Sequence, residues 1–222
     1  MRSLLAGLIS IALVAGCARG RQQPHAHTAG GVHRLAVVGD SVAHGAGDET
    51  GRGISGNLAQ QLNAQVSNLG IDGARTPDVL RLLGTAAARQ AIVSADAIVV
   101  SIGGNDLYGD SVARLLAAAW PALHMTPTLD RVAAIVTRLH KINPEARVYL
   151  LGLFDPYHLP ELDRQVAIWD SSLIARFAED ADVDVVRIAD LFIYTSRLSS
   201  LDHFHPGAAG YAAIAARIAS TW

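Results

Sequence analysis

Short aliphatic runs alternate with helical patterns from Leu35 to the end of the chain. The runs predict strands over residues 35–38, 65–68, 97–104, 147–154 and 183–188. The intervening segments predict helices over residues 55–63, after Thr76, and over residues 128–142, 162–179 and 207–220. Apolar strands separated by helices are typical of a parallel sheet covered on both faces. The pattern therefore predicts an α/β fold: a three-layer α/β/α sandwich with an open, flavodoxin-like, five-stranded parallel sheet.

In such a sheet ligands bind at the carboxyl ends of the strands, so residues just after a strand are the best candidates for a site. One segment departs from the simple alternation, because Leu107 to Thr128 is an extended insert before the helix at 128–142. Its Trp120, Leu123 and Met125 either supply pocket walls or belong to the core, where apolar residues at helical spacing are usually found.

The first residues have a different pattern from the rest of the chain. Arg2 precedes an apolar stretch that ends in small residues directly before Cys17. This form is typical of a secretory signal, and the stretch is too short to span a bilayer comfortably. The run from Val14 to Cys17 resembles the lipobox of bacterial lipoproteins, in which the signal is cut just before a cysteine that carries lipid. We therefore expect a signal peptide over residues 1–16 and an exported, membrane-anchored protein, with ordinary secretion as the alternative.

Residues 17–32 show no apolar periodicity and are interpreted as the lipidated cysteine followed by a flexible tether. His25 and His27 lie in this tether, but a mobile segment offers no fixed geometry for a metal, so no metal site is expected. Residues 33–222 then form the folded domain.

Composition narrows the possible partners. Half of the 222 residues are hydrophobic, which is enough for one substantial core and one domain, and we expect a monomer. The formal net charge is −2, and Lys141 is the only lysine, so nucleic acid is not an expected partner. Cys17 is the only cysteine, so the chain forms no internal disulfide.

Ser41 is a candidate nucleophile because it follows the first predicted strand, in the run Gly39-Asp40-Ser41. Taken alone, such a serine is more often a turn residue that satisfies a backbone group. A nucleophilic hydroxyl needs a base and an oxyanion site from elsewhere in the chain. Gly70 and Asn105 each follow another predicted strand, and backbone N–H groups or a side-chain amide suit a developing oxyanion. Either could equally be a loop residue.

Asp202 and His205 lie three residues apart just before the last predicted helix, a spacing that lets a carboxylate orient an imidazole. The spacing is weak evidence, because Asp155 and His158 share it directly after the fourth predicted strand. Spacing cannot choose between these pairs. Two further histidines, His44 and His203, lie close to the candidate residues and are additional competitors.

Four sequence blocks, which contain Ser41, Gly70, Asn105 and the pair Asp202 and His205, together resemble the GDSL or SGNH hydrolase family. They occur in the family's order and cover nearly all of the chain from Leu35 onward. The resemblance implies the SGNH hydrolase fold, a nucleophile at Ser41 and a base at His205, with Asp202 as the orienting acid. It implies oxyanion donors at the Ser41 backbone, Gly70 and Asn105. In that family the base lies near the C-terminus and is often followed by proline, which favours Asp202 and His205 over the other pair. Asp40 and Asp106 are expected to organise loops.

The resemblance implies a serine esterase or acylhydrolase that forms an acyl-enzyme and needs no cofactor. Small acyl esters or thioesters, lysophospholipids and acetylated glycans all remain possible substrates, because fold does not fix substrate. The main alternative is a non-catalytic envelope lipoprotein that binds glycan or lipid on the same fold. A nucleotide-binding loop is disfavoured, because Thr50 stands where the third glycine of the fingerprint belongs. The absence of a Gly-x-Ser-x-Gly motif argues against an α/β-hydrolase with a nucleophile elbow.

Overall fold

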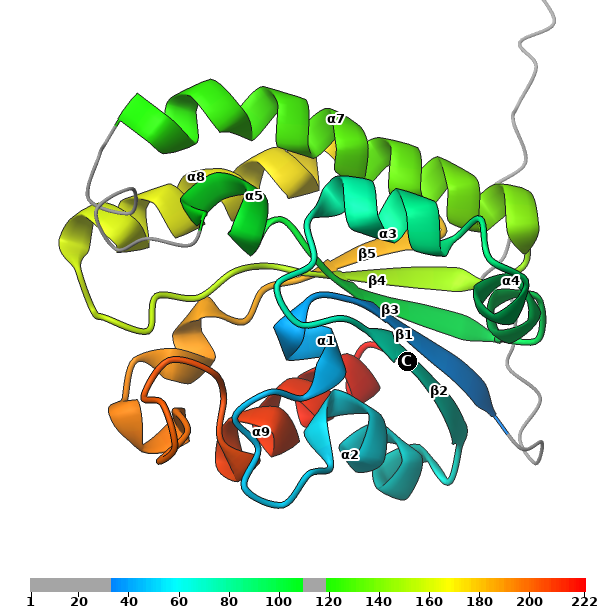
Figure 1. Ribbon diagram of the computed structural model, residues 1–222, viewed down its shortest axis with the longest axis horizontal. Coiled ribbons are helices and arrows are strands. Elements are labelled where there is room, and N and C mark those ends of the chain that lie inside the picture. Colours follow the sequence, from blue (N-terminus) through cyan, green and yellow to red (C-terminus); the bar gives the residue numbers. More distant parts are fainter. Residues whose placement is uncertain (1–32, 110–118) are drawn as a thin grey trace, which may run out of the picture. The chain divides into compact units, whose positions relative to one another are not determined.

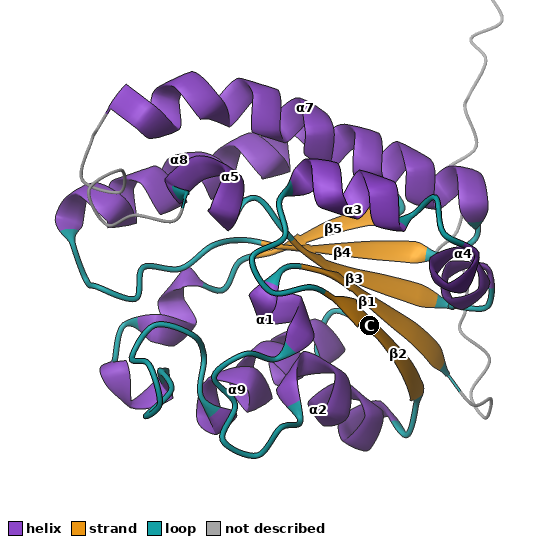
Figure 2. Ribbon diagram, in the orientation of Figure 1, coloured by secondary structure: helices purple, strands orange, loops and turns teal. Residues whose placement is uncertain are grey.

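The sheet has five parallel strands in the order β2-β1-β3-β4-β5. The structure is a computed structural model that describes residues 33–109 and 119–222. The strands are β1 (Arg34–Gly39), β2 (Gln65–Gly70), β3 (Ala97–Ser101), β4 (Arg147–Leu151) and β5 (Val183–Val186). Figure 2 shows the sheet between two layers of helices. This confirms the predicted three-layer α/β/α arrangement and its flavodoxin-like parallel sheet.

Helices cover both faces of the sheet (Figure 1). One face is covered by α3 (Thr76–Leu82), α4 (Ala86–Val93), α5 (Gly104–Tyr108), α7 (Ala119–Ile142) and α8 (Pro160–Phe177). The other face is covered by α1 (Ser41–His44), α2 (Gly53–Leu62) and α9 (Ala208–Ala219). Two short 3₁₀ helices, η1 (Ala189–Phe192) and η2 (Thr195–Arg197), lead from β5 toward α9.

Alternating side chains along the central strands pack into two separate hydrophobic cores, one on each face of the sheet. In β1, Ala36 and Val38 pack in the cluster under α3, α4, α7 and α8, whereas Leu35 and Val37 pack against α1, α2 and α9. Because successive strand side chains point to opposite faces, a strand buried on both sides must be apolar at every position. This requirement explains the continuous aliphatic runs in the sequence and gives the site a rigid base.

Three local features differ from the expected pattern. The helical segment after Thr76 is broken into α3 and α4, because the chain turns at Gly84 and Thr85 caps a new helix through its side chain. The helix expected from Thr128 starts earlier, at Ala119, and continues through Pro127. The short helices α1 and α5 were not predicted, since each is only about one turn long and leaves no apolar period to detect.

Several expectations concern residues that the structure does not describe. The signal peptide, Cys17 and the tether lie outside the described residues, as do the side chains of Trp120 and Leu123. Met125 is described and packs against the core cluster on the α7 side of the sheet. Among the described helices, none is both long enough and apolar enough to cross a bilayer.

Candidate active site

Ser41 is the first residue of α1, directly beyond the carboxyl end of β1. Gly39 makes the sharp exit from the strand with φ of +143°, and a Cβ there would lie 1.8 Å from the carbonyl oxygen of Ser101. Only glycine fits such an approach. Asp40 then caps α1 by accepting the Val42 N–H at 3.1 Å. These two neighbours hold Ser41 at the edge of the sheet with its backbone N–H in the first turn of a helix, where no intrahelical acceptor exists.

The Asp40 carboxylate is buried beneath Ser41 and also accepts the Ser101 hydroxyl at 3.0 Å, which ties β1 to β3. Burial raises the pKa of Asp40 to about 6, although the hydrogen bonds from Ser101 and from backbone N–H groups act in the opposite direction. Asp40 therefore organises the turn, as expected.

Asp202 and His205 lie on the loop between η2 and α9, and they contact one another as the spacing allowed. The Asp202 Oδ2 lies 2.7 Å from Nδ1 of His205. Its Oδ1 accepts the backbone N–H groups of Phe204 at 2.9 Å and of His205 at 3.0 Å. Burial alone raises the pKa of Asp202, but the hydrogen bonds from the His205 ring and these two N–H groups outweigh it, so the net pKa is below its usual value. Asp202 is therefore a carboxylate at neutral pH.

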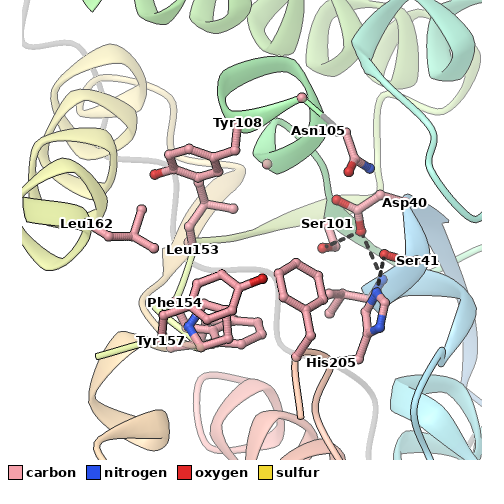
Figure 3. A pocket seen from close by; sticks show the side chains of 17 residues that line it. Asp40, Ser41, Ser101, Asn105, Tyr108, Leu153, Phe154, Tyr157, Leu162 and His205 are labelled. Carbon is pink, nitrogen blue, oxygen red and sulfur yellow. Dashed lines mark hydrogen bonds between the residues drawn. The ribbon is translucent and has the colours of Figure 1, made fainter. Parts of the chain in front are cut away.

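The opposite nitrogen of the same ring faces Ser41. His205 Nε2 lies 2.9 Å from the Ser41 Oγ, across a sequence separation of 164 residues (Figure 3). Because the Asp202 carboxylate only accepts hydrogen bonds, it selects the tautomer with a proton on Nδ1, which leaves Nε2 free to accept the serine proton. The three side chains thus form a continuous Ser-His-Asp hydrogen-bonded chain.

Asn105 lies in α5, just after β3, and lines the same pocket as Ser41 (Figure 3). Its Nδ2 donates to the carbonyl oxygen of Ala74 at 3.0 Å. An amide nitrogen carries two hydrogens, so one remains for a ligand. The next residue, Asp106, accepts the backbone N–H and hydroxyl of Thr76 at 2.9 and 2.6 Å, which confirms that it organises this loop.

Gly70 does not lie where the oxyanion prediction requires. It is absent from the residues that line the pocket, and its N–H donates to the Asn68 side chain at 2.8 Å. A Cβ at this position would lie 2.1 Å from the backbone nitrogen of His44. We therefore correct its assignment: glycine is required here so that the end of β2 can approach α1, and its N–H is already used.

The competing residues are occupied elsewhere. The Asp155 carboxylate accepts the backbone N–H groups of Tyr157 and Leu159, at 2.7 and 2.5 Å, and so shapes the loop after β4. His158 is exposed, and among the described residues it makes no hydrogen bond to Asp155. His44 pairs with Asp72 at 2.7 Å, and His203 is exposed. Among the histidines that the structure describes, only His205 forms a side-chain hydrogen bond with Ser41.

Residues 37–213 match the family described as the GDSL-like Lipase/Acylhydrolase family. The chain belongs to this family. The run Gly39-Asp40-Ser41-Val42 is its form of the GDSL sequence, with valine in place of leucine. Membership supports an acylhydrolase that acts on ester bonds, which agrees with the expected class of enzyme.

Solved structures with the same fold include lipases and esterases. The chain is similar to the lipase Lip_vut3 from a goat rumen metagenome, with a TM-score of 0.73 and 19% identity over 85% of this chain and 97% of that one. It is also similar to phospholipase A1 from Streptomyces albidoflavus NA297, with a TM-score of 0.66 and 19% identity over 86% of this chain and 100% of that one. A sequence relative, the uncharacterised protein YpmR of Bacillus subtilis strain 168, is 27% identical over 98% of this chain and 92% of its own length.

In this GDSL family member the pocket beside Ser41 has mainly apolar walls. Figure 3 shows the pocket between the Ser41–His205 pair and the side chains that follow β4. The walls come largely from α5, the loop after β4, the start of α8 and the loop that carries Asp202 and His205. The apolar residues are Tyr108, Leu153, Phe154, Pro156, Tyr157, Leu162 and Phe204. The Phe204 ring also packs edge-on against the His205 ring at a centroid distance of 4.9 Å. The pocket can therefore hold an apolar group next to the serine.

Sequence reasoning missed most of these walls. The strand predicted over residues 147–154 includes Leu153 and Phe154, whereas β4 ends at Leu151 and both residues line the pocket. The available signal was their place at the carboxyl end of a predicted strand. Within the described ranges, no three His, Cys, Asp or Glu side chains are grouped so as to hold a metal ion.

Proposed function

We propose that this GDSL-family acylhydrolase cleaves carboxylic esters with Ser41 as nucleophile, His205 as general base and Asp202 as the group that orients the base. The observation that supports this most strongly is the unbroken chain from Ser41 Oγ to His205 Nε2, at 2.9 Å, and from His205 Nδ1 to Asp202, at 2.7 Å. The first contact is within the range of hydrogen bonds that transfer protons in catalysis, and the second is short enough to fix the orientation and tautomer of the imidazole.

In the acylation step His205 Nε2 takes the proton of the Ser41 hydroxyl as Oγ attacks the ester carbonyl carbon. The carbonyl becomes a tetrahedral oxyanion, and the imidazolium is stabilised by the Asp202 carboxylate at 2.7 Å. When the tetrahedral intermediate collapses, the bond to the alcohol oxygen breaks and Nε2 returns the proton to the departing alkoxide. The products of this half-reaction are an alcohol and an acyl ester on Ser41.

In the second half-reaction a water molecule takes the place of the alcohol. His205 accepts one proton from the water as its oxygen attacks the acyl carbon, and then gives that proton to the Ser41 oxygen as the acyl bond breaks. The carboxylic acid leaves and the free enzyme is restored. Every proton transfer in the cycle uses Nε2, so Nδ1 keeps its proton toward Asp202 throughout.

Two donors are proposed to stabilise the oxyanion. One is the Ser41 backbone N–H in the first turn of α1, and the other is the free amide hydrogen of Asn105, whose side chain is fixed by its bond to Ala74. Donors aimed in advance at a developing negative charge are usually the largest single contribution to such catalysis. Gly70 is not part of this set.

The substrate is proposed to be an ester with an uncharged, apolar acyl group. The apolar walls support this choice, and among the residues that the structure describes the pocket lining includes no lysine or arginine that would bind a phosphate or carboxylate. The size of the acyl group and the nature of the alcohol are left open. We also keep the proposal that lipid on Cys17 anchors the domain to a membrane after cleavage of residues 1–16.

The test is hydrolysis of p-nitrophenyl butyrate by the purified domain and by its Ser41→Ala variant. We expect the wild-type domain to turn over the ester and the variant to lose at least about a thousandfold in kcat/KM, because within the described ranges Ser41 is the hydroxyl that hydrogen-bonds to the His205 ring. Circular dichroism and thermal unfolding check that both proteins are folded. Equal rates for the two folded proteins would refute the proposal.

A further inference from the structure

The loop between α1 and α2 contacts the loop that carries Asp202 and His205, and the Glu49 side chain in the first loop forms hydrogen bonds that join the two. Its Oε1 accepts the backbone N–H of Ser200 at 2.7 Å and the Ser200 hydroxyl at 2.9 Å. Its Oε2 accepts the backbone N–H of Ala208 at 3.0 Å. A single carboxylate thus spans a sequence separation of 151 residues to Ser200 and 159 residues to Ala208.

The two contacts of Glu49 lie on either side of the catalytic pair. Ser200 precedes Asp202, and Ala208 follows His205 as the first residue of α9. The loop that carries the pair is closed by a backbone hydrogen bond, because the Ser199 N–H donates to the carbonyl oxygen of His205 at 2.8 Å. A segment closed in this way moves as one unit, so contacts at its two ends determine where it lies relative to Ser41.

Glu49 is itself fixed relative to Ser41. The N–H of Ala46 donates to the carbonyl oxygen of Ser41 at 2.9 Å, so the loop begins on the nucleophile itself. The Asp48 side chain accepts the Gly53 N–H at 2.7 Å and closes the other end of the loop at the start of α2. The loop between α1 and α2 is therefore a rigid arm from Ser41 to Glu49.

The same two loops are in close contact at a second point. Gly47 has φ of +82°, and a Cβ there would lie 2.6 Å from the Cβ of His205. The Tyr211 hydroxyl in α9 also donates to the carbonyl oxygen of Ala46 at 2.7 Å. The glycine allows the arm to lie directly against the base, so a small shift of either loop changes the distance between Ser41 and His205.

The contacts of Glu49 require a carboxylate. Three donors and no acceptor face its two oxygens, and the backbone N–H of Ser200 contributes most to lowering its pKa to about 2. Glu49 is thus ionised wherever an imidazole base is active. A glutamine would place an NH₂ group opposite either the Ser200 or the Ala208 N–H, because an amide has only one acceptor oxygen.

We propose that Glu49 is a positioning residue for ester hydrolysis: its carboxylate holds both ends of the Asp202–His205 loop and thereby sets the separation of the Ser41 hydroxyl from its base. Glu49 is not among the described residues that line the pocket, so it acts through His205 and not on the substrate. The inference rests on the proposed catalytic triad, and its test separates the two.

The experiment is a double-mutant cycle on p-nitrophenyl butyrate hydrolysis with wild type, Glu49→Gln, His205→Ala and the combined variant. We expect Glu49→Gln alone to lower kcat about 10- to 100-fold with KM changed less than about twofold, since a misplacement of about 1 Å can cost such a factor. In the His205→Ala background the same substitution should change kcat less than about twofold. Glu179→Gln, an exposed residue that loses the same charge, serves as the control and should be unchanged.

The outcomes are distinct. An equal factor for Glu49→Gln in both backgrounds, or a folded Glu49→Gln variant within twofold of wild type, would overturn the positioning role while the triad stands. A His205→Ala variant with full activity would instead overturn the proposed function. If Glu49→Gln does not fold, Ser200→Ala, which removes only the hydroxyl contact, replaces it in the cycle. Its expected loss is about threefold with His205 present and none without it, and equal losses would again overturn the role.

Discussion

At the scale of single residues, the site depends on groups that are buried for geometric reasons and have altered chemistry as a result. Asp40 is the clearest case. It must sit under Ser41 to cap α1 and to accept the Ser101 hydroxyl, so it is 5% exposed. Burial raises its pKa from the ordinary value of 3.8 to about 6. The residue that shapes the nucleophile's turn therefore also makes the stability of the fold depend on pH.

Asp40→Asn should remove this dependence. Below about pH 4 the carboxyl is protonated in both states; between pH 4 and 6 the unfolded chain loses its proton first, so wild-type stability falls as the pH rises. The loss levels off above pH 6 at about 3 kcal/mol. Asparagine can still accept the Val42 N–H without a charge. The free energy of unfolding in urea, measured for both proteins from pH 4 to 7.5, should show the variant gaining on wild type over this interval; parallel curves would exclude the effect.

At the scale of elements, the sequence predicts what depends on burial. Leu35 to Val38 and Ala97 to Val100 are apolar throughout because both faces of a central parallel strand are covered. Both strands lie where the sequence predicts them, although β3 ends at Ser101 and not at Gly104. Elements shorter than the helical period escape this reasoning, as α1 and α5 show. The early start of α7 was missed because proline usually ends a helix, whereas Pro127 lies within this one.

The candidate site was predictable to the same extent. Ser41 and Asn105 are candidates because each follows a predicted strand, whereas Asp202 and His205 are preferred over Asp155 and His158 only through the resemblance to the family. The structure brings Ser41, Asn105, Asp202 and His205 to one pocket or contact network. Gly70 was misassigned because a sequence cannot tell a glycine that offers its N–H from one that allows two backbones to meet. Glu49 has no motif at all, since its partners are backbone N–H groups 151 and 159 residues away.

The end of β2 and the start of α5 should respond differently to substitution. Gly70→Ala forces a Cβ within 2.1 Å of a backbone nitrogen, so we expect the free energy of unfolding to fall by about 2 kcal/mol or more. Asn105→Ala removes the proposed oxyanion donor and should lower kcat about 100- to 1,000-fold, with a stability cost near 1 kcal/mol from the lost bond to Ala74. Urea unfolding and ester kinetics on both variants check this. A Gly70→Ala variant of normal stability would contradict the packing role assigned to Gly70.

At the scale of the whole molecule, the proposed triad combines segments that are far apart in the sequence. Ser41 follows the first strand and His205 precedes the last helix, 164 residues later. The parallel sheet brings them together, because the segments that carry the site all leave the same edge. The exported, lipid-anchored state expected from Cys17 concerns residues outside the described ranges and stays a prediction.

The most direct test of the account is to trap the covalent enzyme and locate the modified residue. The domain is treated with a fluorophosphonate, digested and analysed by mass spectrometry, with His205→Ala and His158→Ala variants in parallel. We predict one adduct per chain, on Ser41, with a labelling rate that falls by several orders of magnitude in His205→Ala and changes little in His158→Ala. An adduct on another residue, or fast labelling that depends on His158, would contradict the proposed triad.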